Sequence, residues 1–150
     1  MLKVGDRVNL IKVKFHDNSE INFPEEGKKY ILFFYPKDNT PGCTAEACSL
    51  RDGYGDIKKL GYELYGVSVD STKSHLKFID NHQLPFSLIS DDEKKLVEAF
   101  GVWGLKKFMG REYMGTNRAT FVIDEKGIIT HLIEKVDTKK AAEQLLDILS

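Results

Sequence analysis

Residues 30–43 read YILFFYPKDNTPGC, and this stretch carries the strongest signal for the fold. Its first half is an apolar run rich in β-branched and aromatic residues, which is typical of a strand buried on both faces. Pro36 ends the run, and a short polar loop follows. Thr40 fits the N-cap position of a helix, and Pro41 fits its first turn. The stretch therefore predicts a buried strand that leads through a tight loop into a helix.

The spacing of apolar residues on either side of this stretch predicts the other elements. A helical stripe begins at Cys43 and continues to Ile57. The remaining expected elements are, in chain order, a hairpin of strands 8–13 and 21–23, strand 63–69, helix 72–81, strand 85–89, helix 93–100, an irregular segment 101–117, a hairpin of strands 119–123 and 128–134, and helix 138–149. Alternating helices and strands imply parallel pairing, and the last hairpin adds antiparallel strands. We expect one α/β domain, residues 1–150, with a mixed central sheet flanked by helices, an N-terminal β-hairpin and a βα insertion.

The composition excludes several classes of function. The chain has 150 residues, with 22 basic and 23 acidic side chains and a net charge of −1. Proteins that bind nucleic acids or membrane surfaces usually carry a basic excess, so neither partner is expected. There is no run of about 18 apolar residues, the minimum for a spanning helix. The first residues, MLKVGDRVNLIKV, lack the features of a secretory signal, so we expect a cytoplasmic location, where thiols stay reduced.

Cys43 is the leading candidate for chemistry because it follows a buried strand and lies in the first turn of the predicted helix. Free backbone N–H groups and the helix macrodipole stabilise an anion such as a thiolate at that place. The alternative is that Cys43 is only a small buried apolar residue. Reduction of a peroxide also needs donors that hold the leaving oxyanion. Thr40 offers a hydroxyl, which is equally suited to plain N-capping. The cation could come from Arg51, Arg111 or Arg118.

Cys48 is the second cysteine, five residues further along the same predicted helix. Ideal helix geometry separates the two Cα atoms by about 8.7 Å, beyond the limit of roughly 7 Å for a disulfide. A bond between the cysteines therefore requires the first helical turns to unwind. This spacing suits a cycle in which Cys43 becomes a sulfenic acid, the helix opens and Cys48 condenses with it.

The sequence FFYPKDNTPGCTAEACSLRD, residues 33–52, resembles the active-site segment of peroxiredoxins, specifically the peroxiredoxin Q group, also called bacterioferritin comigratory protein. The pattern Pro-x3-Thr-x2-Cys is present as Pro36, Thr40 and Cys43. A second block resembles the same group: GVWG at residues 101–104, then Gly-x2-Tyr-x-Gly at 110–115, then Arg118 before TFVID. The resemblance covers essentially the whole chain and implies a thioredoxin-like fold.

The resemblance also implies a function and a set of site residues. It implies a thiol peroxidase that reduces hydrogen peroxide and organic hydroperoxides, and whose disulfide is reduced by thioredoxin or a similar dithiol protein. The implied site residues are Cys43 as peroxidatic cysteine, Cys48 as resolving cysteine, Thr40 and Arg118 as hydrogen-bond partners of thiolate and peroxide, Pro36 as a shield of the pocket, and Glu46 as the residue that orients the arginine. The resemblance favours a monomer or weak homodimer.

Three alternatives compete with a peroxidase. A dithiol–disulfide oxidoreductase of the same fold normally uses C-x2-C, which is absent. A copper-binding module is a second alternative, since soft thiolates prefer Cu(I). An inert structural domain is the third. The four histidines are scattered without metal-ligand spacing, so surface roles are expected for them, and no metal. The glycines form no phosphate-binding loop, and no cofactor is expected.

Overall fold

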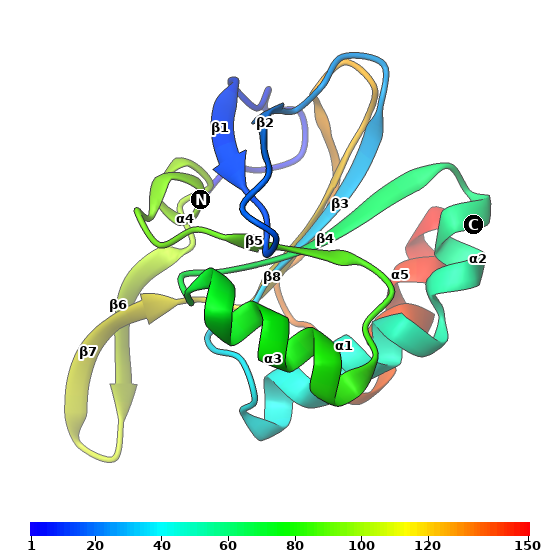
Figure 1. Cartoon of the computed structure of the whole chain (residues 1–150). Coiled ribbons are helices and arrows are strands. Elements are labelled where there is room, and N and C mark those ends of the chain that lie inside the picture. The colour runs from blue at the N-terminus through cyan, green and yellow to red at the C-terminus, as the bar shows by residue number, and fades with distance from the viewer.

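A five-stranded mixed sheet forms the centre of the computed structural model, which describes all residues, 1–150 (Figure 1). The elements are β1 (Ile11–Lys14), β2 (Glu20–Phe23), β3 (Lys29–Phe34), α1 (Pro41–Asp52), α2 (Tyr54–Lys59), β4 (Tyr62–Ser68), α3 (Thr72–His82), β5 (Ser87–Ser90), α4 (Lys95–Ala99), β6 (Trp103–Phe108), β7 (Arg111–Thr116), β8 (Ala119–Ile123), β9 (Ile129–Ile133), a 3₁₀ turn (Thr138–Lys140) and α5 (Ala141–Leu149). The strand order in the central sheet is β5-β4-β3-β8-β9. Strands β3, β4 and β5 are parallel, whereas β8 and β9 are antiparallel to their neighbours, so the predicted mixed sheet is confirmed.

Strand β3 is buried on both faces, as the apolar run predicts. Tyr30, Leu32 and Phe34 pack into a core beneath the β1–β2 hairpin and α4. Ile31 and Phe33 point to the opposite face, where α1, α2, α3 and α5 cover the sheet. Alternate side chains of one strand thus anchor two apolar cores. Burial on both faces holds the strand at the centre of the sheet. It therefore also fixes the position at which the loop to α1 begins.

The pairing of β3 with β8 brings two distant segments together at that carboxyl end. The register places Phe34 opposite Ala119. Arg118 precedes Ala119, so it lies beside the point where the chain leaves β3 for the loop before α1. Cys43 and Arg118, which are 75 positions apart in the sequence, therefore meet where the chain leaves β3 and enters β8.

The helix predicted from Cys43 to Ile57 is two helices, α1 and α2, which meet at Gly53. A Cβ atom at Gly53 would lie 2.5 Å from the Cβ of Ala142 in α5. No ordinary side chain fits at that distance, so the glycine permits the close approach of α5. Ser49 accepts a hydrogen bond from the backbone N–H of Ala142 at 3.1 Å, which attaches the second half of α1 to the same helix.

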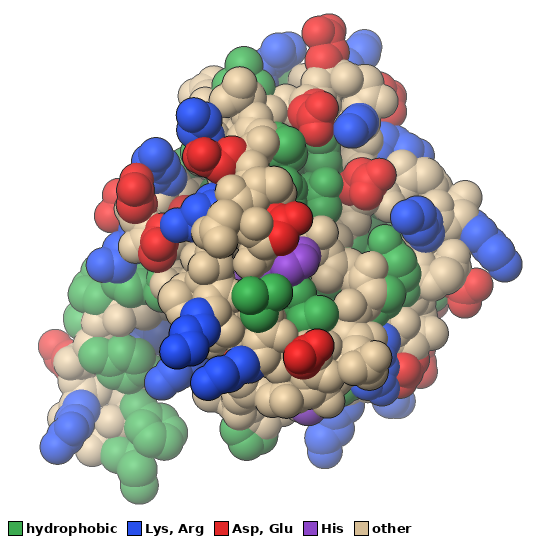
Figure 2. Space-filling model, in the orientation of Figure 1, with side chains coloured by type: hydrophobic (Ala, Val, Ile, Leu, Met, Phe, Trp, Pro, Cys, Tyr) green, Lys and Arg blue, Asp and Glu red, His purple; other side chains and the backbone are tan.

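The prediction that residues 101–117 are irregular is wrong, because these residues form a separate β6–β7 hairpin. Its turn places Met109 and Gly110 at φ 52° and 77°, the left-handed conformation that a two-residue hairpin turn requires. The hairpin projects from the body at the lower left of Figure 1, and apolar side chains gather on it in Figure 2. Leu105 is 59% exposed and Met109 is 87% exposed. With both faces largely outside the core, the hairpin lacks the alternating pattern that would have identified it.

Other boundaries differ by a few residues. The helix predicted at 93–100 begins at Lys95, because the Asp91 carboxylate accepts hydrogen bonds from the N–H groups of Leu96 and Val97 at 3.0 and 2.8 Å. The predicted helix 138–149 starts with the 3₁₀ turn before α5. None of the helices has the length and apolar character needed to cross a membrane.

Candidate active site

Cys43 lies in the first turn of α1, and its side chain is 1% exposed. Thr40 occupies the N-cap position with an extended backbone, and Pro41 begins the helix, both as predicted. Of the two roles left open for the Thr40 side chain, plain N-capping is not the one seen, because its hydroxyl makes no capping bond and donates to the carbonyl oxygen of Lys37 at 2.9 Å. The first backbone N–H groups of the helix have no intrahelical partner. The helix start therefore presents a sulfur atom together with free amide donors.

Arg118 is the cation of the site. Its Nη2 donates to Cys43 Sγ at 3.3 Å. The other two candidates lie elsewhere: Arg51 donates to the carbonyl of His82, and Arg111 is exposed on the β6–β7 hairpin. Burial opposes the charge of Arg118, but Glu46 and Cys43 outweigh this effect and raise the pKa of the guanidinium above its ordinary value. A fixed positive charge beside the sulfur stabilises negative charge that develops there.

Glu46 lies one turn after Cys43 and holds Arg118 in place. The Nη1 of Arg118 donates to Glu46 Oε1 at 2.5 Å, while Glu46 Oε2 is buried without a hydrogen-bond partner. Burial raises the pKa of Glu46 from 4.5 to about 7, although the neighbouring guanidinium acts in the opposite direction. Gly42 leaves room for the Arg118 guanidinium, because a Cβ atom at that position would lie 3.2 Å from Nη2.

The other two residues of the predicted site lie on either side of Cys43 along the chain. Pro36 is half-buried at the start of the loop that leads from β3 to α1. Cys48 is half-buried in the same continuous helix as Cys43, and both cysteines are free thiols. Because both residues are helical, a bond between them requires α1 to unwind over its first turns.

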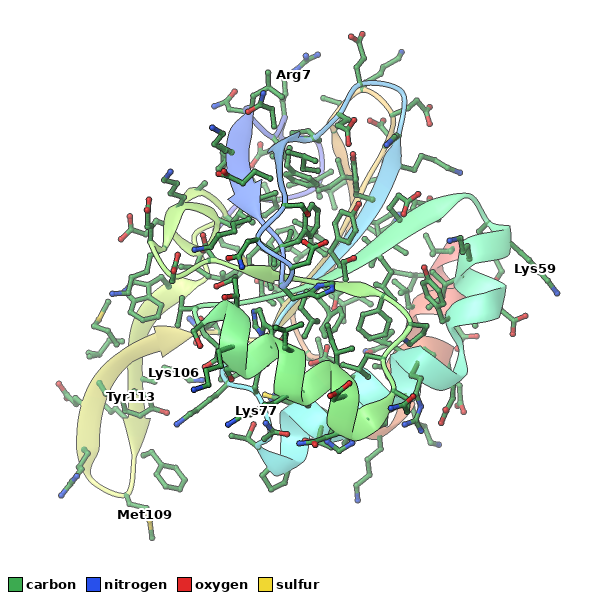
Figure 3. The ribbon with its side chains drawn as sticks, in the orientation of Figure 1. Arg7, Lys59, Lys77, Lys106, Met109 and Tyr113 are labelled. Atoms are coloured by element: carbon green, nitrogen blue, oxygen red, sulfur yellow. The ribbon has the colours of Figure 1, made fainter.

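Sequence reasoning did not identify Lys106, which lies on β6 of the hairpin. Its Nζ donates to the carbonyl of Thr116 at 3.0 Å, and Figure 3 labels it between the hairpin and the body of the protein. Burial and the charge of Arg118 lower the pKa of Lys106, whereas Cys43 acts in the opposite direction. Lys106 is therefore a second cation within electrostatic range of Cys43 and Arg118, and it comes from the segment that was predicted to be irregular.

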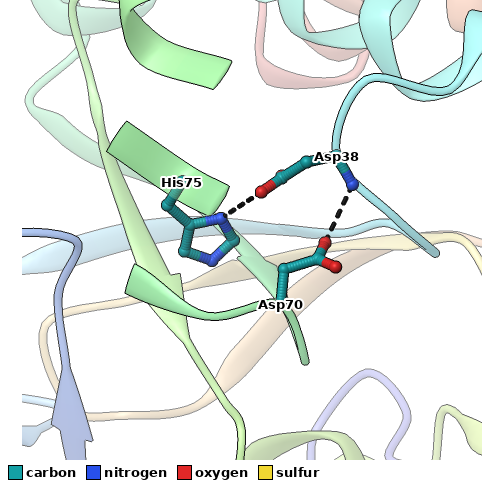
Figure 4. A group of neighbouring side chains, drawn as sticks. All are labelled: Asp38, Asp70 and His75. Carbon is teal, nitrogen blue, oxygen red and sulfur yellow. Dashed lines mark hydrogen bonds and ion pairs between the residues drawn. The ribbon is translucent and has the colours of Figure 1, made fainter. Parts of the chain in front are cut away.

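Sequence reasoning also missed a buried polar network below the loop that precedes α1 (Figure 4). The prediction that all histidines lie at the surface is wrong for His75, which is 0% exposed. Its Nδ1 lies 2.7 Å from Asp38 Oδ2, and its Nε2 lies 2.9 Å from the carbonyl oxygen of Ile89. Asp70 accepts a hydrogen bond from the backbone N–H of Asp38 at 2.8 Å. Single aspartates and a histidine at these spacings match no motif, so only the fold reveals the network.

Comparison with known proteins places this site in a family. Residues 4–132 match the model of the AhpC/TSA family. The chain belongs to that family and, within it, to the peroxiredoxin Q or Bcp group. It is 42% identical over 149 residues to peroxiredoxin Bcp of Bacillus subtilis, covering 99% of this chain and 95% of the relative. It is 37% identical over 147 residues to peroxiredoxin Bcp of Escherichia coli, covering 97% and 94%.

Solved peroxiredoxin structures agree with this assignment. A variant of peroxiredoxin Q from Xylella fastidiosa superposes with a TM-score of 0.92 at 28% identity, covering 99% of this chain and 96% of that one. A bacterioferritin comigratory protein from Xanthomonas campestris, studied for alkyl peroxide reduction, gives a TM-score of 0.90 at 28% identity with the same coverage. The thioredoxin-like fold is confirmed. This peroxiredoxin is a thiol peroxidase that reduces peroxides, with a thioredoxin-type dithiol as reductant.

Proposed function

We propose that Cys43 is the peroxidatic nucleophile and that Cys48 resolves the oxidised enzyme through an intramolecular disulfide. The observation that carries this proposal is the contact of 3.3 Å between Arg118 Nη2 and Cys43 Sγ at the start of a helix. The buried sulfur faces a cation and free amide donors, and this combination suits attack on a bond whose leaving group is an oxyanion.

The first step transfers one oxygen atom. The Cys43 thiolate attacks an oxygen of the hydroperoxide, an S–O bond forms and the O–O bond breaks. The leaving alkoxide or hydroxide takes a proton and departs as alcohol or water. The sulfur becomes a sulfenic acid, oxidised by two electrons, and the peroxide is reduced by the same two. Arg118 and the amides of Gly42 and Cys43 hold the reacting oxygens, Thr40 accepts a hydrogen bond from the peroxide, and Pro36 shields the sulfur from water.

The second step joins the two cysteines. After the first turns of α1 unwind, the Cys48 thiol attacks the sulfenic sulfur, and a disulfide and water form. A dithiol protein of the thioredoxin type then reduces the disulfide by thiol exchange, which returns both thiols and oxidises the partner. Because this cycle depends on a supply of reduced dithiol, we place it in the cytoplasm.

We expect the protein to be a monomer or a weak homodimer. Sedimentation velocity tests this expectation.

Thioredoxin-coupled peroxide consumption tests the assignment of the two cysteines. Cys43→Ser should abolish turnover. Cys48→Ser should still reduce one equivalent of peroxide per chain and then fail to recycle with thioredoxin. If Cys43→Ser turns over at the parent rate, or Cys48→Ser recycles normally, the corresponding role is wrong.

A further inference from the structure

The loop between β3 and α1 is held by two aspartates that lie outside the site described above (Figure 4). The Asp38 side chain is 1% exposed, and both of its oxygens accept hydrogen bonds: Tyr35 donates its hydroxyl to Oδ1 at 2.6 Å, and Ser74 donates to Oδ2 at 2.8 Å. His75 also reaches Oδ2, and its Nε2 must carry the hydrogen because its partner there is a carbonyl oxygen. Through its side chain, Asp38 thus attaches the loop to Ser74 and His75 of α3.

Asp70 fixes the backbone of the same loop. It follows the carboxyl end of β4, the strand next to β3, and its Oδ2 accepts from the N–H of Asp38 at 2.8 Å. Ser68 donates to the same oxygen at 2.7 Å and so holds the carboxylate in place. The Asp38 N–H belongs to the same planar peptide unit as the carbonyl of Lys37. Asp70 therefore sets the orientation of that carbonyl.

The Lys37 carbonyl is the acceptor for the Thr40 hydroxyl, at 2.9 Å. A hydroxyl group has one hydrogen to donate and two lone pairs that accept. Because the hydrogen of Thr40 is committed to Lys37, the hydroxyl oxygen is left with its lone pairs, three residues before Cys43. An organic hydroperoxide brings one O–H donor and hydrogen peroxide brings two, whereas Arg118 can only donate. Thr40 thus supplies a hydroxyl acceptor for that O–H beside the reacting sulfur.

We propose that Asp70 is a positioning residue for peroxide reduction, acting through the Lys37–Asp38 peptide to keep the Thr40 hydroxyl as the acceptor for the peroxide O–H. The assignment rests on the proposed function, in which Cys43 attacks a hydroperoxide beside Thr40. Removal of the Asp70 carboxylate frees the peptide plane, and the Thr40 hydroxyl is then no longer fixed in its accepting orientation. The contact between Cys43 and Arg118 uses none of these hydrogen bonds.

The test compares two reactions of Cys43 in Asp70→Ala: oxidation by hydrogen peroxide, followed by rapid quench, and alkylation by iodoacetamide. Alkylation depends on the reactivity of the Cys43 sulfur but involves no peroxide O–H, so it does not need the Thr40 acceptor. One lost positioning hydrogen bond predicts that oxidation slows about tenfold. Alkylation should change less than twofold. Asp70→Asn keeps an oxygen that can accept from the Asp38 N–H and should retain most of the rate. Asp80→Ala, at an exposed aspartate of α3, is the matched control and should match the parent.

A double variant separates positioning from a general structural role. Thr40→Val removes the hydroxyl, so adding Asp70→Ala to it should slow oxidation no further. The proposal is overturned if Asp70→Ala slows oxidation and alkylation equally, or slows Thr40→Val as much as the parent, or leaves the parent rate unchanged. A parent chain in which Cys43 shows no reaction with peroxide would instead overturn the proposed function, and this role with it.

Discussion

The buried Glu46 carboxyl makes the stability of this peroxiredoxin depend on pH in an unusual direction. Burial raises the pKa of Glu46 from 4.5 to about 7, so the folded state binds its proton more tightly than the unfolded state does. Between these two values the folded chain holds the proton while the unfolded chain releases it. The free energy of unfolding contributed by this group is therefore fully present below pH 4.5 and is lost as the pH rises through 7.

The magnitude follows from the two pKa values. A difference of about 2.5 pKa units corresponds to roughly 3 kcal/mol over the whole titration, and to about 2.5 kcal/mol between pH 5 and pH 8. Glu46→Gln removes the ionisation but keeps a carbonyl oxygen that accepts from Arg118 Nη1. The variant should therefore gain stability relative to the parent as the pH rises, by about 2.5 kcal/mol between pH 5 and pH 8.

Urea denaturation at several pH values between 5 and 8 measures this difference for the parent and Glu46→Gln. Glu134→Gln, at an exposed position after β9, serves as the matched control and should follow the parent throughout. Parallel stability profiles for parent and Glu46→Gln would refute the reasoning, because they would mean that Glu46 titrates alike in the folded and unfolded chain.

Two further predictions test the contacts of the site and of the helix break. Arg118→Met should slow oxidation of Cys43 by peroxide roughly 10²- to 10³-fold, as loss of an oxyanion donor does, in rapid-quench assays; the exposed Arg111→Met should keep the parent rate, and equal rates for the two would contradict the role of Arg118. Gly53→Ala should lower the urea-derived stability by about 1–3 kcal/mol, because its Cβ would lie 2.5 Å from Ala142. Gly55→Ala has open space and should not destabilise, so equal losses at both glycines would refute the packing argument.

The sequence predicted the elements whose residues meet a simple physical requirement. The run from Tyr30 to Tyr35 is buried because its apolar side chains alternate between two cores. Thr40 and Pro41 begin a helix because of their backbone preferences. Cys43 could be placed at that helix start from local sequence alone. The choice of Arg118 over Arg51 and Arg111 needed the resemblance, since the decisive contact depends on the register of β3 with β8.

The features that sequence reasoning missed depend on contacts between distant segments or on unusual backbone. Met109 adopts a left-handed backbone conformation, which is uncommon for methionine, so the sequence carries no signal for the β6–β7 turn. Lys106 then went unassigned because the hairpin that carries it was not predicted. Asp70 and His75 are ordinary polar residues in the sequence and join Asp38 only when β4 and α3 pack beside the loop.

The central claim, that Cys43 and Cys48 form the catalytic disulfide, is tested most directly on a single peptide. Trypsin releases residues 38–51, which contain both cysteines and no internal cleavage site. After one equivalent of hydrogen peroxide, mass spectrometry should find this peptide lighter by two hydrogen atoms and resistant to alkylation at both sulfurs until a reductant is added. A peptide that keeps an alkylatable Cys48 and carries oxygen only on Cys43 would contradict the account.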